Sequence, residues 1–111
     1  MKKIVYPLEQ VLDVKQKRVD DAERELEKKR RELETEKEKL ETCKKERQVV
    51  QDHLDEQYIN YTEVISAATT PDKIVSLRKY IETVISKLKI EDDKVQAQER
   101  EVRNAEIAVT E

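Results

Sequence analysis

The sequence predicts an all-α protein, with two long helices folded back on each other as an antiparallel coiled-coil hairpin. The first observation is composition: 44% of the 111 residues are charged and none is glycine, which is typical of long helices. The second is that apolar residues recur every seven positions in two separate stretches, the pattern of a coiled-coil seam. The third is that only one segment, "SAATTPDK" at 66–73, interrupts this pattern.

The first stretch predicts one helix over residues 7–67. Pro7 suits its first turn, where a missing backbone N–H has no effect on the helix. A companion column, three residues after the main one, starts at Leu8 and becomes polar in the middle of the helix. The main column is apolar at every position except Arg47: Val5, Leu12, Val19, Leu26, Leu33, Leu40, Arg47, Leu54, Tyr61 and Ala68.

The second stretch predicts a helix over residues 71–111 after a loop at 68–70. Thr70 suits the N-cap position, Pro71 the first helical position, and Asp72 the first turn. A loop this short makes its two helices antiparallel neighbours, so residues 1–111 form a single helical hairpin. The apolar column of this helix consists of Ile74, Ile81, Leu88, Val95, Val102 and Val109.

The two predicted helices differ in length, at roughly 90 Å and 60 Å. Glu111 then reaches only about as far as residue 27 of the first helix. The N-terminal stripe is left uncovered, which is unusual for a soluble monomer. We expect a partner to cover it: a missing C-terminal segment, a second copy in a homodimer, or another protein. The second helix stops while its apolar heptad column is still regular, at Val109. This favours a C-terminally truncated chain over a natural end. The stripe consists of Leu8, Val11, Leu12, Val19 and Leu26.

Composition also argues against several functions. Acidic and basic residues are mixed and the net charge is −3, so no one-sided basic surface for nucleic acid is expected. No apolar run is long enough for membrane insertion. A phosphate-binding loop needs glycine and the sequence has none, so we expect no enzyme and no cofactor. With one histidine and no set of ligands expected from converging helices, we also expect no catalytic or metal-binding residues. His53 is expected on a solvated flank, and Cys43 as a half-buried, inert thiol in a reducing compartment.

Two features predict contacts between the helices. Arg47 and Glu91 each interrupt an apolar column at corresponding heights, which predicts an interhelical ion pair that fixes register. Near the loop, Tyr58 is expected to meet Tyr80, with Tyr61 in the seam. These three tyrosines are candidate partner-binding residues. The alternative is that their rings only close the hairpin.

The opening "YPLEQVLDVKQKRVDDAERELEKKRREL", with Tyr6-Pro7-Leu8-Glu9, and the later "PDKIVSLRKYIETVISKL" resemble the YscO/FliJ (SctO) family, and most of all its chlamydial members. The resemblance implies a non-enzymatic central stalk of a type III secretion system, in the bacterial cytoplasm beside the inner-membrane apparatus. It implies that the end with both termini enters the hexameric export ATPase, that the loop end faces the export gate, and that secretion chaperones bind. The alternative is a generic coiled-coil spacer or tether.

Overall fold

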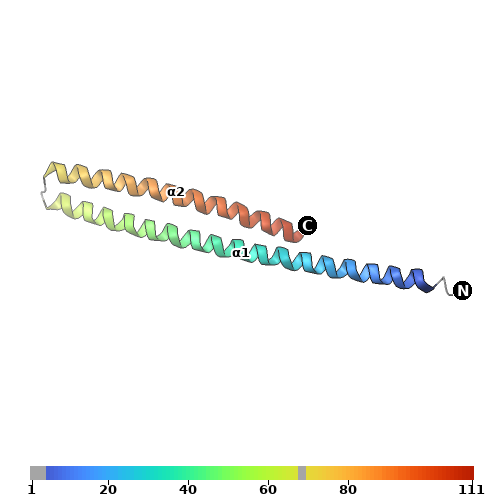
Figure 1. The fold of residues 1–111 in the computed structure, drawn as a ribbon. Coiled ribbons are helices and arrows are strands. Elements are labelled where there is room, and N and C mark those ends of the chain that lie inside the picture. The colour runs from blue at the N-terminus through green and yellow to red at the C-terminus, as the bar shows by residue number, and fades with distance from the viewer. Residues whose placement is uncertain (1–4, 68–69) are drawn as a thin grey trace.

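The computed structural model describes residues 5–67 and 70–111, with side chains from residue 8 on. It contains two helices, α1 (Val5–Ser66) and α2 (Pro71–Thr110), which run back along each other as a hairpin (Figure 1). The molecule measures 103 × 14 × 14 Å. The predicted all-α, two-helix hairpin is therefore confirmed.

The helix boundaries follow local chemistry. α1 starts at Val5, two residues earlier than predicted, and Pro7 falls in its first turn. Of the predicted loop, residues 68 and 69 lie outside the described part of the chain. Thr70 precedes α2 with an extended backbone (φ −64°, ψ 145°), and its carbonyl oxygen accepts bonds from the amides of Lys73 and Ile74. Its side chain makes no capping hydrogen bond, so the carbonyl and Pro71 define this helix start.

The best-packed part of the seam lies in the half of the hairpin next to the loop. Val50 and Leu54 from α1 pack with Ile81 and Val84 from α2, and all four are buried. Tyr61, Leu77 and Leu88 pack against this cluster and are partly buried. At these positions apolar column residues of α1 lie opposite apolar column residues of α2, so the core forms where the two stripes face each other.

At the open end of the hairpin, the start of α1 and the end of α2 lie at different heights. α1 has 62 residues and α2 has 40, so α1 extends about 30 Å beyond the end of α2 (Figure 1). The C-terminal end of α2, from Ala108 to Thr110, and the following Glu111 line a surface hollow together with Ala22, Leu26 and Lys29 of α1. The loop register places Glu111 at this level, so residues 8–21 continue as a single helix. We call this segment the N-terminal arm.

Candidate functional site

The N-terminal arm carries exposed apolar side chains. Leu8 is 63% exposed, Leu12 57% and Val19 50%, and Val11 is also exposed. Leu26, the fifth residue of the predicted stripe, is half-buried instead, because it lies level with the end of α2. The bare part of the stripe therefore ends before Leu26.

A second strip of the arm was missed by reasoning from the heptad columns. Val14 is exposed, and it lines a shallow surface hollow with Val11, Lys15 and Arg18. Val14 belongs to neither column of the seam, but its spacing of three from Val11 places both on one helix face. The spacing of three residues was the sequence signal that could have revealed this second strip. The arm thus presents apolar surface on more than the seam face, with two cations beside it.

The tyrosines near the loop do not form the predicted cluster. Tyr80 meets His53: their rings are in an edge-to-face arrangement with centroids 5.8 Å apart, and His53 Nε2 lies 2.7 Å from the Tyr80 hydroxyl. Tyr61 is half-buried in the seam as predicted, and its hydroxyl accepts a hydrogen bond from Arg78 at 3.1 Å. The ring of Tyr58 is 47% exposed. The expected meeting of Tyr58 with Tyr80 was wrong.

The physical reason lies in helix geometry. His53 and Tyr58 are five residues apart, which places them about 140° apart around the axis of α1. Because His53 faces Tyr80, Tyr58 points to the opposite flank of the seam. The same contact corrects the expectation for His53, which is half-buried and bridges the helices instead of lying on a solvated flank.

The ion pair predicted for Arg47 forms with a different carboxylate. Arg47 Nε donates a hydrogen bond to Oδ1 of Asp92. The arginine therefore contacts α2 at the predicted height, but its partner is Asp92 and not Glu91. Both side chains of this pair are about two-fifths exposed. A long arginine side chain leaves the seam and places its charged group at the water-facing edge, where Asp92 lies. Glu91 stays in the seam, 7% exposed, and its Oε1 lies 3.4 Å from Nζ of Lys94.

A second polar contact crosses the seam nearer its open end. Gln98 Nε2 donates to Oε2 of Glu36 at 2.5 Å and to the Glu36 backbone carbonyl at 3.0 Å. This hydrogen bond from Gln98, more than any other interaction, lowers the pKa of Glu36 below its usual 4.5. Glu36 and Gln98 are polar residues at seam positions, and the apolar columns do not predict that they pair. Together with Arg47–Asp92, this contact fixes the relative height of the helices.

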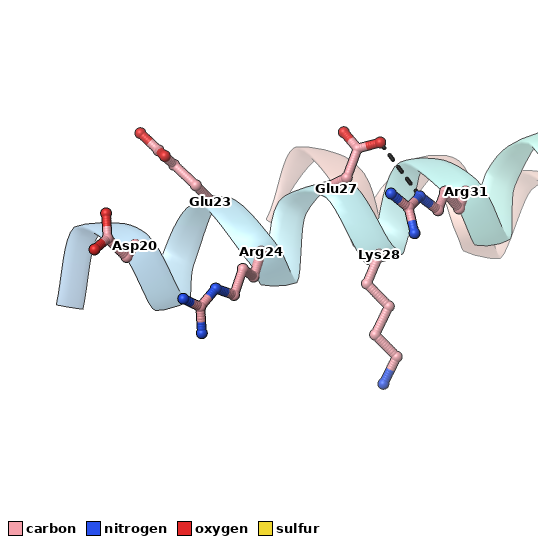
Figure 2. Close-up of a pocket in the computed structure, with 6 residues that line it drawn as sticks. All are labelled: Asp20, Glu23, Arg24, Glu27, Lys28 and Arg31. Carbon is pink, nitrogen blue, oxygen red and sulfur yellow. Dashed lines mark hydrogen bonds and ion pairs between the residues drawn. The ribbon is translucent and has the colours of Figure 1, made fainter. Parts of the chain in front are cut away.

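The face of α1 around residues 20–31 is charged and solvated. Figure 2 shows six side chains projecting from this helix surface, with a marked ion pair between Glu27 and Arg31. The Glu27–Arg31 contact is 3.4 Å long, and the spacing of four residues places the two side chains on one face of the helix. Such exposed pairs support the helix by a few tenths of a kcal/mol each. This face therefore serves mainly to keep a long helix soluble. Its side chains are Asp20, Glu23, Arg24, Glu27, Lys28 and Arg31.

Within residues 5–67 and 70–111, no group of three or more His, Cys, Asp or Glu side chains is arranged to hold a metal ion. Cys43 is a free, half-buried thiol at a seam position. Among the same residues, neither helix has a segment long and apolar enough to cross a membrane.

The fold and its surfaces define a class: an elongated coiled-coil rod with unpartnered apolar side chains beyond its open end and near its loop. The YscO-like protein family model matches residues 3–111. A solved structure of a candidate YscO homolog, CT670 from Chlamydia trachomatis, matches 94% of this chain and 68% of its own, with 37% sequence identity and a TM-score of 0.74. No curated protein sequence matches this chain.

The chain belongs to the YscO-like family, a family of type III secretion components. The resemblance stated from the N-terminal and second-helix motifs is thus confirmed at the level of the family.

Proposed function

We propose that this protein is a non-enzymatic central stalk and adaptor of a type III secretion system. In this role it couples the hexameric export ATPase to the export gate and binds secretion chaperones in the cytoplasm beside the inner membrane. The supporting observation is the N-terminal arm, a single helix that extends about 30 Å past α2 and exposes Leu8, Leu12 and Val19. Exposed apolar side chains grouped on one face are typical of a surface that binds a partner, and the YscO-like family match supports a role in type III secretion.

The arm is proposed as the surface that enters the ATPase ring. Its apolar face, with Val11 and Val14 beside Lys15 and Arg18, offers both hydrophobic contact and positive charge. Leu26 marks where this surface meets the end of α2. The other proposed occupants of the arm are a further segment of the chain and a second copy of it, and binding to the ATPase ring would compete with either.

The loop end is proposed as the surface that contacts the gate. Tyr58 and Tyr80 are equally exposed, at 47% and 46%, but Tyr80 and Tyr61 hold contacts across the hairpin, so Tyr58 is the tyrosine best placed for this contact. Ile65 and Ile85 are also exposed in this half of the hairpin and add apolar area. Tyr58→Ala is expected to weaken gate binding by about 1–3 kcal/mol, the range of an interface hot spot.

The test is a binding isotherm with the cognate hexameric export ATPase. The variant replaces Leu8, Leu12 and Val19 with Ser together, and the control is Val49→Ser, which changes a 69% exposed side chain far from the arm. We expect the wild type and the control to bind and the triple variant to lose at least tenfold in affinity. A generic spacer or tether, the competing function, would show no binding by any of the three proteins.

A further inference from the structure

The seam of the hairpin changes from packed apolar contacts to polar contacts at Glu91. On the loop side of this residue, four apolar side chains from both helices are buried together. At its level, Arg47 leaves the seam to bond Asp92, so one main-column position contributes a charge instead of a packed apolar group. The layer around Glu91 is therefore a boundary between a packed apolar segment and a polar one.

Glu91 is itself poorly accommodated. The residue is 7% exposed, and its Oε1 lies 3.4 Å from Lys94, a neighbour on its own helix. Its Oε2 is buried and has no hydrogen-bond partner. A buried acceptor without a partner destabilises the state that buries it, and a charged acceptor does so more strongly. That penalty disappears when water reaches the oxygen, which happens if the helices part at this point.

The segment beyond Glu91 holds the helices together less firmly. Between residues 92 and 110, Val102 is the one described side chain that is buried. Beyond the Arg47–Asp92 pair at the Glu91 level, the interhelical hydrogen bonds of this segment run from Gln98 to Glu36, a polar contact that water can replace. Local opening is easiest where few apolar contacts are buried.

We propose that the hairpin has a hinge at the Glu91 layer. Residues 93–110 of α2 separate from α1 and return, while the Arg47–Asp92 pair stays at the hinge layer and the core around Val50, Leu54, Ile81 and Val84 keeps the loop end closed. In the open state, Leu26, Leu33 and Leu40 lose their cover and extend the exposed stripe of the N-terminal arm along α1. The hinge follows from the packing alone and does not depend on the proposed function.

The test measures distances across each half of the hairpin with paired spin labels. Cys43→Ser removes the one native cysteine, and cysteine pairs are then introduced at exposed positions. Lys28 with Glu106 reports on the open end, and Asp52 with Glu82 reports on the loop end. We expect one narrow distance population for the loop-end pair and two populations for the open-end pair.

Substitution of Glu91 then separates a hinge from ordinary fraying of a helix end. Glu91→Leu fills the layer with an apolar group and should lower the open population by about tenfold or more. Glu91→Gln, which keeps the shape, should lower it less. Glu101→Leu makes the same change at an exposed site and should have no effect.

The loop-end pair also checks that each variant folds. A single narrow population at both pairs of the parent protein would overturn the hinge. So would equal effects of Glu91→Leu and Glu101→Leu, because the opening would then not depend on this layer.

Discussion

The loop-end core and the N-terminal arm have the same sequence pattern and opposite burial. Leu54 and Leu12 occupy the same heptad column of α1, yet Leu54 is 6% exposed and Leu12 is 57% exposed. The difference is the facing helix: α2 lies opposite Leu54 and ends before it reaches Leu12. Periodicity therefore specifies which face of a helix can be buried, and a second helix decides whether it is.

The strongest test of this comparison removes the same side chain from each region. Leu54→Ala should lower the free energy of unfolding by about 2–5 kcal/mol, because it leaves a cavity in the packed core. Leu12→Ala should change it by no more than about 0.5 kcal/mol in the isolated protein. Urea unfolding followed by circular dichroism measures both. Equal losses would mean that the arm is already covered in solution.

A smaller effect is expected from the aromatic residues near the loop. Tyr80→Ala removes the edge-to-face contact with His53 and should destabilise the hairpin by about 0.5–1.5 kcal/mol. Tyr58→Ala, on the opposite flank, is the matched control and should stay within about 0.5 kcal/mol of wild type. Thermal melting compares the two. A melting temperature lowered equally by both would place Tyr58 in the fold and not on a binding surface.

The Arg47–Asp92 pair should contribute less to the free energy of unfolding than the Tyr80–His53 contact. Both side chains are partly exposed, and ion pairs of this kind are usually worth no more than about 1 kcal/mol. Arg47→Met keeps the aliphatic length and should leave the unfolding free energy within about that range. A loss several times larger would show that the pair acts as a buried one.

The smallest expected effect is a dependence on pH from Glu36. Because its folded-state pKa is lowered, the carboxylate stabilises the hairpin at pH values above its usual 4.5, and this contribution is lost as pH falls through the lower folded value. Gln98→Ala should therefore lower the melting temperature at neutral pH, and the difference from wild type should shrink under acid. Paired melts across pH measure it. A difference that stays constant with pH would contradict the assignment.

The sequence was sufficient to predict the architecture, because two heptad columns and a Thr-Pro-Asp start define two helices and their order. It was also sufficient to place the exposed arm, since the helix lengths follow from those boundaries. It failed for contacts at the edges of the seam. The partners of Arg47 and Tyr80 depend on which flank each side chain reaches, and columns of apolar residues do not specify the flanks. Asp92 and His53 were therefore identified only from the structure.

The shape of the rod has a consequence for how the protein behaves in solution. Its radius of gyration is 28.0 Å, whereas a compact globule of this length would have about 13 Å. A single molecule tumbling end over end sweeps a much larger sphere, so it should elute from a sizing column at the position of a far heavier globular protein. Early elution is therefore expected even of a monomer, and only a shape-independent mass, such as one from light scattering, can count its copies.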